Sequence, residues 1–262
     1  MGVRVVTSPL ISVICCAHNE EEYVDKSVPN LLHVLRGCTF EIIFVADRCT
    51  DKTVERATNY QIKIIDKKWK KWKNSYAESL QTGYLIARGE YISIVDADIV
   101  VPANFFKDVI SKLKGNVTSV AAQVVTYPDT LLNRMMNAWE KTHEFAPLGR
   151  QPRGAARVII KKVLDEIGGF RDVPAPDTDI DIRLAEKGYL SVANLAVKVY
   201  HIRHLSFKRI VNGQISIGRR RYSLGISLMR TMGHAVFRAR PLVIYGWLLE
   251  WIKFKLITSD EY

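Results

Sequence analysis

Four short apolar runs in the first hundred residues, each followed by polar residues, constrain the fold of this 262-residue chain most strongly. The runs cover residues 11–16, 40–46, 63–65 and 91–95. Continuous apolar runs of this kind are typical of parallel strands that are buried on both faces. Between them lie stretches with helical character, at residues 24–35, from residue 53 onward and at 75–87. The alternation predicts an α/β fold with a doubly wound sheet.

Three polar loops follow these runs, at residues 17–22, 47–51 and 96–98. In doubly wound sheets, ligands bind beyond the carboxyl ends of the strands. We therefore expect the three loops to meet and to form a binding site. After residue 102 we expect further strands at 117–125, 158–160 and 191–200, and helices at 105–113, 131–145 and 162–167. An acidic loop from residue 175 is expected to lead into a helix ending at Gly188, and the chain from residue 207 is expected to be helical and basic.

The fourth apolar run ends in two aspartates, Asp96 and Asp98. On extended backbone, side chains at positions i and i+2 point to the same side. Both carboxylates can then contact one hard divalent cation. Mg²⁺ and Mn²⁺ prefer oxygen ligands and commonly share their coordination with substrate phosphates. The pair therefore indicates a metal site that carries a diphosphate, with an incidental acidic turn as the alternative.

The positive charge of the chain is concentrated near its C-terminus. Residues 201–262 hold eleven Lys and Arg against three Asp and Glu, which places +8 of the total +11 there. A basic surface points to nucleic acid, anionic lipid or phosphorylated substrates. The chain contains no helix-turn-helix, RNP or zinc-finger pattern, so nucleic acid is not an expected partner.

The cysteines argue for a reducing compartment. Cys15, Cys16, Cys38 and Cys49 form no CxxC pair. They are interpreted as reduced thiols, neither a disulfide framework nor a zinc site.

The apolar stretch at residues 242–257 is too short for a spanning helix, and charged residues interrupt it. Its two tryptophans, with Arg238 and Arg240 just upstream, suit a helix that lies in a membrane interface. A helix packed on its own domain is the alternative. We expect the protein to attach to the cytoplasmic face of the cell membrane, peripherally or through helices beyond Tyr262.

Five blocks of sequence, in this order, resemble the inverting nucleotide-sugar glycosyltransferases of family 2. The blocks are SVICCAHNEEEYV, EIIFVADRCTDKT, TGYLIARGEYISIVDAD, GAARVIIKKVLDEIGGF and PDTDIDIRLAEKGY. The resemblance covers residues 12–204 and implies the GT-A fold with a mixed central sheet. It implies a Rossmann-like nucleotide-binding half at 8–115 and an acceptor half at 116–204. A basic, amphipathic helical segment at 205–262 would follow.

The resemblance also implies roles for individual residues. The base, ribose and diphosphate of the donor would contact Ala17, His18, Asn19, Glu20, Asp47, Asp96, Ala97 and Asp98. His201 stands where many members carry a histidine that can join Asp96 and Asp98 as a metal ligand. Asp177 matches the catalytic aspartate of the family, and Gly154 would lie near the sugar and the acceptor.

Some of these residues have plainer interpretations. Asp177, Asp179 and Asp181 suit the start of a helix, where the helix dipole favours acids. Lys73 and the arginines Arg219, Arg220 and Arg221 suit contacts with a diphosphate or with lipid phosphates, or else a solvated basic face. At the end of the second apolar run, Ala46 replaces one of the two acidic residues usual in the family, so the base preference stays open.

The function predicted from the sequence is metal-dependent, inverting transfer of a hexose, mannose or glucose, from a nucleotide-sugar. GDP-mannose and UDP-glucose are the expected donors, and Mg²⁺ or Mn²⁺ is the expected cofactor. The acceptor is a hydroxyl or a phosphate, expected on a polyprenyl- or dolichyl-linked molecule or another phospholipid. One alternative is a haloacid-dehalogenase-like phosphatase in which Asp96 is the nucleophile. The other is a non-catalytic basic protein that binds nucleic acid or membranes.

Overall fold

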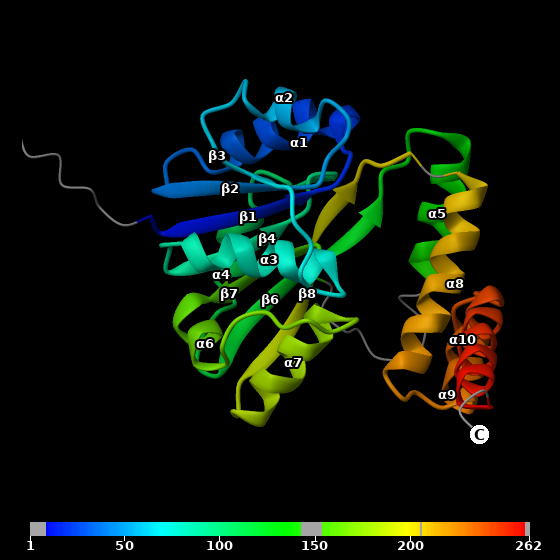
Figure 1. Cartoon of the computed structure of the whole chain (residues 1–262). Helices are drawn as coiled ribbons and strands as arrows, with labels where there is room; N and C mark the ends of the chain where they lie inside the picture. The colour runs from blue at the N-terminus through cyan, green and yellow to red at the C-terminus, as the bar shows by residue number, and fades with distance from the viewer. Residues whose placement is uncertain (1–8, 143–153, 205, 260–262) are drawn as a thin grey trace, which may run out of the picture. The chain divides into compact units, whose positions relative to one another are not determined.

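The computed structural model describes residues 9–142, 154–204 and 206–259, which form two compact units (Figure 1). The first unit contains the described residues up to 125 and those from 154 to 203. The second unit contains residues 126–142 and the described residues from 204 onward.

A mixed sheet forms the centre of the first unit. Its strands lie in the order β3-β2-β1-β4-β7-β6-β8-β5. Their bounds are β1 (Ile11–Ala17), β2 (Phe40–Asp47), β3 (Lys63–Lys67), β4 (Tyr91–Val95), β5 (Ile99–Val100), β6 (Val117–Thr126), β7 (Ala156–Ile160) and β8 (Leu190–His201). Strands β1 to β4 run parallel, whereas β7 is antiparallel to β4 and β6, and β5 is antiparallel to β8. The expected mixed sheet with a Rossmann-like half is confirmed.

Helices pack on both faces of this sheet. Helices α1 (Glu21–Val34), α2 (Thr53–Ala57) and α4 (Phe105–Ile110) contribute to one apolar cluster, and α3 (Ser75–Ile86), α6 (Lys161–Glu166) and α7 (Pro176–Glu186) to the other. Strand β1 supplies both clusters in alternation, with Val13 and Cys15 on one side and Ile14 and Cys16 on the other. Because both faces are covered, every residue of the strand is buried and all but Ser12 are apolar.

Several boundaries differ from those expected. Helix α1 begins at Glu21, inside the stretch expected to be a loop, because Glu21 and Glu22 occupy its first turn, where the helix dipole favours acids. Helix α7 begins at Pro176, so the expected acidic loop is the first turn of the helix. Strand β5 was not expected, since two residues are too few to produce a pattern.

The second unit is helical beyond residue 126. It contains α5 (Leu131–Thr142), α8 (Phe207–Ser223), α9 (Leu228–Phe237) and α10 (Leu242–Ser259). The last residues of the helix expected at 131–145 lie outside the described residues. The division expected from the sequence places α5 in the stretch 116–204, whereas its contacts group it with the C-terminal helices. Within the described part of the chain, every helix is too short or too polar to cross a bilayer.

Two glycines let α8 and α10 approach each other closely. A Cβ atom on Gly218 would lie 2.1 Å from the carbonyl oxygen of Val243, and one on Gly246 would lie 2.1 Å from that of Ile215. Both obstacles are backbone atoms of the partner helix, which cannot rotate away. The contact therefore depends on the absence of side chains at these positions.

Replacing Gly218 with alanine should destabilise the second unit by about 1–3 kcal/mol, because the added methyl group forces the two helices apart. The matched control is Gly213→Ala in the same helix, where a Cβ meets nothing within 4 Å. There the gain in helix propensity should leave stability unchanged or raise it. Thermal unfolding followed by circular dichroism measures both effects. Equal midpoints for the two variants would contradict the close contact.

Candidate active site

The three polar loops of the parallel half meet around a cavity of about 390 Å³ in the first unit. They follow β1, β2 and β4, and the start of α3 and the end of β8 complete the walls. The lining residues are Cys16, Ala17, His18, Glu20, Asp47, Arg48, Ser75, Tyr76, Ser79, Asp96, Asp98, His201 and Arg203. The expectation that the loops converge at the carboxyl ends of the strands is confirmed.

Asp98 is buried and lies between the side chains of His201 and Arg203. Its Oδ2 atom is 3.0 Å from His201 Nε2 and 2.8 Å from Arg203 Nε. Arg203 also pairs with the carboxylate of Glu20. Burial alone would raise the pKa of Asp98, but the hydrogen bond and charge of His201 and the charge of Arg203 lower it. Asp98 is therefore an anion at neutral pH.

Asp96 and Glu20 are less well compensated. The hydroxyl of Tyr76 donates a hydrogen bond to Asp96 Oδ1 at 2.9 Å. Loss of solvent and the negative charge of Asp98 nevertheless raise the pKa of Asp96 to about 7. Burial raises the pKa of Glu20 to about 7 as well, against the opposing charge of Arg203. The cavity thus has more negative charge than its own cations neutralise, which favours an added cation.

Asp47, at the end of β2, is held by three donors. Arg48 Nε and Lys67 Nζ contact its Oδ1 atom at 3.0 Å and 2.7 Å, and the hydroxyl of Ser75 donates to Oδ2. Burial would raise the pKa of Asp47, but these hydrogen bonds lower it to about 2. Lys67 is fully buried and also pairs with Glu78 at 3.0 Å. The side of the cavity formed by β2 is therefore internally neutralised.

The first loop is braced against the second. His18 donates from Nδ1 to the carbonyl oxygen of Asp47 at 2.6 Å, which specifies its tautomer. Asn19 adopts a φ of 56°, a conformation that asparagine tolerates, and its Oδ1 accepts from the Thr50 N–H at 2.8 Å. Asn19 braces the loops and does not line the cavity.

Asp177 lies in the first turn of α7 and does not line the cavity. A Cβ atom on Gly154 would lie 3.1 Å from that of Asp177, so this glycine makes room for the aspartate. Burial and the charge of Asp96 raise the pKa of Tyr76, and Asp177 adds to this shift. The charge of Asp177 thus acts on Tyr76, which lines the cavity.

Two neighbouring aspartates of α7 have structural partners. Arg183 pairs with Asp179 and donates to the carbonyl oxygen of Gly169 at 2.8 Å, which ties the helix to the preceding turn. The fully buried Arg157 on β7 pairs with Asp181 at 2.9 Å. Within the described part of the chain, no hydrogen bond or ion pair engages the carboxylate of Asp177. Of the three acids, Asp177 alone is left available for chemistry.

The remaining predicted residues lie elsewhere. Ala97 is buried and its N–H donates to the Cys16 carbonyl oxygen. Lys73 is exposed, and its N–H donates to Asp172. Arg219, Arg220 and Arg221 belong to α8 of the second unit, where Arg221 bonds Thr231. None of them lines the cavity of the first unit, and their assigned roles stay predictions.

Sequence reasoning missed several cavity residues, among them Arg48, Ser75, Tyr76, Ser79 and Arg203. Ser75 and Tyr76 open the helix that follows β3, so they lie at the ligand-binding edge that the topology defines. Arg203 stands two residues after His201, and the alternation of an extended chain predicts that both side chains share one side. Both signals were present in the sequence.

The side chains around Asp98 offer oxygen and nitrogen donors to a divalent metal ion. Among residues 9–142, 154–204 and 206–259, no three His, Cys, Asp or Glu side chains form a ready-made metal cluster. Asp98 and His201 nevertheless meet at 3.0 Å, beside the under-neutralised Asp96. Magnesium-like ions use one or two protein carboxylates and complete their shell with substrate phosphates and water. The residues therefore fit an ion that enters with a diphosphate.

The mixed sheet, with its cavity at the carboxyl ends of the parallel strands, has the GT-A fold. The mannosyltransferase PcManGT of Pyrobaculum calidifontis, solved with GDP-Man and Mn²⁺, superimposes with a TM-score of 0.63 at 19% identity, covering 93% of this chain and 70% of that one. Glucosyl-3-phosphoglycerate synthase of Mycobacterium tuberculosis, solved with Mn²⁺, UDP and phosphoglyceric acid, gives 0.59 at 15% identity, covering 82% and 77%. These likenesses establish the GT-A fold.

The model of Glycosyl transferase family 2 matches residues 12–170, and the chain belongs to this family. An uncharacterized glycosyltransferase of Haemophilus influenzae is 31% identical over 112 residues, which are 41% of this chain and 34% of that protein. A dolichol-phosphate mannosyltransferase of Pyrococcus furiosus is 28% identical over 108 residues, 40% and 30% of the two chains. The matched region spans about a third of these relatives. Family membership sets aside the phosphatase and the non-catalytic alternatives.

The raised pKa of Asp96 predicts a pH-dependent stability in the presence of a chelator. The folded protein holds this proton up to about pH 7, whereas the unfolded chain releases it near pH 4. Stability is therefore lost as pH rises through this window. The side chain of Asp96→Asn can still accept a hydrogen bond from Tyr76 but does not titrate. The difference in thermal unfolding midpoint between this variant and the wild type should therefore increase, in favour of the variant, as the pH rises from 5 to 8. A constant difference across this range would contradict the shift.

Proposed function

We propose that the protein transfers a hexose from a nucleotide-sugar, with inversion, to a lipid-linked acceptor. The observation that carries the proposal is the cavity at the carboxyl edge of β1, β2 and β4, where Asp96, Asp98 and His201 converge. GDP-mannose is the first candidate donor, and UDP-glucose is the second. Relatives of this fold solved with GDP-Man or UDP, each together with Mn²⁺, support both.

Donor binding divides between the two sides of the cavity. The loop after β1 and the neutralised cluster around Asp47 would receive the base and ribose. Asp98, Asp96 and His201 would hold Mg²⁺ or Mn²⁺ with the diphosphate. A bound metal ion would stabilise the charge that develops on the departing diphosphate. The excess negative charge of this side supports the assignment, because a bare diphosphate would be repelled there.

Asp177 is the proposed catalytic base. Its carboxylate has no hydrogen-bond or ion-pair partner among the described residues, and its charge reaches Tyr76 at the cavity wall. It would take the proton of an acceptor hydroxyl as that oxygen attacks the anomeric carbon from the side opposite the diphosphate. A phosphate acceptor would not need this step.

The second unit supports attachment to a membrane surface and an acceptor held by a lipid. Helix α9 exposes Met229, Val236 and Phe237, whose side chains are 76%, 75% and 55% accessible. Met229 and Val236 lie seven residues apart, on one side of the helix. Arg230 is exposed on the same helix. Exposed apolar side chains with basic neighbours suit a helix at an anionic bilayer surface, here proposed to be the cytoplasmic one.

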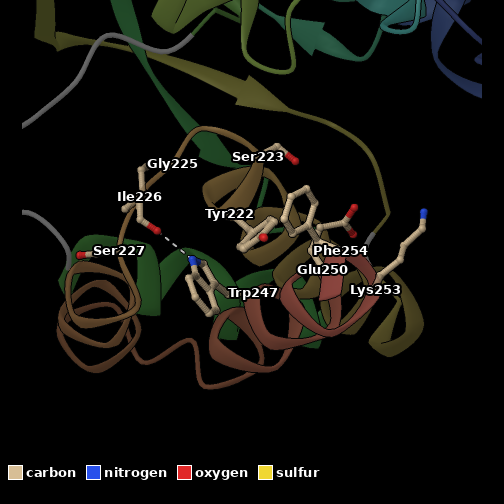
Figure 2. A pocket seen from close by; sticks show the side chains of 9 residues that line it. All are labelled: Tyr222, Ser223, Gly225, Ile226, Ser227, Trp247, Glu250, Lys253 and Phe254. Atoms are coloured by element: carbon tan, nitrogen blue, oxygen red, sulfur yellow. Dashed lines mark hydrogen bonds between the residues drawn. The ribbon is translucent and has the colours of Figure 1, made fainter. Parts of the chain in front are cut away.

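A second cavity supports the lipid part of the proposal. It has a volume of about 640 Å³ and is lined by residues of α8, of α10 and of the connection between α8 and α9 (Figure 2). Tyr222 meets Trp247 edge-to-face at 5.1 Å between ring centroids, and the Trp247 indole N–H donates to the carbonyl oxygen of Ile226. Phe254 adds a third ring, and Figure 2 shows Lys253 extending away from the rings. Such an apolar hollow with a charged rim suits a prenyl or acyl chain.

Asp177→Asn should separate the two kinds of acceptor. With a hydroxyl acceptor, loss of the base should lower kcat by about 10²–10⁴-fold while donor affinity stays unchanged. With polyprenyl phosphate, kcat should fall less than about tenfold. Transfer from labelled GDP-mannose or UDP-glucose with Mn²⁺ measures kcat, and calorimetry measures donor affinity. As the reference variant, Asp98→Ala should lose both; full donor binding and full activity in it would contradict the proposed function.

Membrane attachment should depend on the exposed side of α9. The variant Met229→Glu/Val236→Glu should lose most of its binding to liposomes that contain anionic lipid, because it places two charges on the inserted surface. Leu85→Glu, at a residue 70% exposed on α3, is the matched control and should bind like the wild type. Liposome sedimentation measures the bound fraction. Undiminished binding of the double variant would remove α9 from the proposal.

A further inference from the structure

We propose that Arg203 is an internal counter-ion that holds the Asp98 site closed to a bare metal ion, so that the metal binds together with the diphosphate. The inference rests on the proposed function in one respect, namely that a metal–diphosphate occupies this side of the cavity. It adds a role for Arg203 that makes binding of the two components cooperative.

Asp98 and His201 already contact groups of the protein at the atoms that would bind a metal ion. Asp98 Oδ2 lies 3.0 Å from His201 Nε2 and 2.8 Å from Arg203 Nε. Because a hydrogen bond to a carboxylate requires a proton on Nε2, His201 has no lone pair there to offer a metal in this arrangement. The same Asp98 oxygen also contacts the guanidinium of Arg203. Both proposed metal ligands are thus engaged by the protein itself.

Arg203 also compensates the charge of two buried carboxylates. Asp98 and Glu20 are 3% and 8% exposed, and Arg203 contacts both. Buried carboxylates without a counter-ion are strongly destabilising, so one guanidinium between two of them is held by electrostatic attraction. A dication that binds Asp98 alone must displace this guanidinium from Asp98, and it leaves two mutually repelling cations side by side. A metal that arrives with a diphosphate avoids this cost, because the phosphate oxygens offer Arg203 a new anionic partner.

The contact between Arg203 and Asp98 can be released without a change in the fold. Arg203 Nε lies 2.8 Å from Asp98 Oδ2, yet its N–H makes no hydrogen bond. The N–H therefore does not point at the carboxylate oxygen, and the two groups attract each other through their charges. Arg203 also lies just beyond the last residue of β8, and its side chain is 32% exposed. The guanidinium can therefore turn towards a ligand without disturbing the sheet, while Ile202 keeps its N–H on the Asp98 carbonyl oxygen.

The test is Mn²⁺ binding followed by electron paramagnetic resonance of the free ion, with and without GDP or UDP. Wild-type protein should bind Mn²⁺ weakly alone and at least tenfold more tightly with the nucleotide. Arg203→Gln should bind Mn²⁺ alone at least tenfold more tightly than the wild type, and the nucleotide should enhance its binding less. Arg203→Lys, which keeps the positive charge, should resemble the wild type.

Two further variants make the outcome specific. Arg48→Gln removes the other arginine that lines the cavity, which pairs with Asp47, and should leave Mn²⁺ affinity without nucleotide unchanged. Glu20→Gln/Arg203→Gln removes both partners of one ion pair, so Glu20 is not left as a buried charge without its counter-ion and Asp98 keeps only His201. This double variant should still bind bare Mn²⁺ more tightly. Should Arg203→Gln not fold, this double variant decides the question.

The outcomes separate the inference from the proposed function. If Mn²⁺ binds the wild type with a nucleotide, but neither Arg203→Gln nor the double variant gains affinity for bare Mn²⁺, the counter-ion role is overturned and the proposed function stands. If Mn²⁺ binds the wild type under neither condition, both are overturned. Tight binding of bare Mn²⁺ to the wild type also overturns the counter-ion role.

Discussion

The site is organised by the need to compensate carboxylates buried at one edge of a parallel sheet. Asp47 receives a buried lysine, an arginine and a serine, and its pKa falls to about 2. Asp96 accepts one hydrogen bond, from the hydroxyl of Tyr76, and lies near the negative charge of Asp98. Burial and this charge raise its pKa to about 7. The same sheet edge therefore carries a neutralised side and an under-neutralised side. An additional cation is therefore attracted to the under-neutralised side and not to the neutralised one.

The site depends on the fold, because residues at the ends of strands compensate the charge of the buried carboxylates. Lys67 is the last residue of β3, and Arg203 follows the end of β8, so strands supply the counter-ions. Strand β5 is only two residues long, yet its pairing with β8 places His201 beside Asp98. A shift of that register would separate the would-be ligands. The antiparallel addition to the sheet thus completes a site that the parallel half begins.

The parallel half was predictable from the sequence because its signals are local. Strand-length apolar runs identify β1, β2 and β4, and topology alone places their following loops together. The positions of Arg203, Tyr76 and Arg157 relative to the aspartates were not predictable, because they follow from pairings between strands and helices distant in the sequence. Asp177, Asp179 and Asp181 show the same limit. All three suit a helix start, and only the arginine partners of the latter two distinguish them.

Helix α10 shows why hydrophobicity alone did not decide between an interfacial and a packed helix. Around Gly246 the helix lies against α8 so closely that a methyl group would meet backbone. Yet Tyr245 and Ile252, seven residues apart, are about half exposed. One helix therefore has a packed side and an open side, and its sequence is apolar on both. Gly246 marks the packed side, because the close approach of α8 leaves no room for a side chain there.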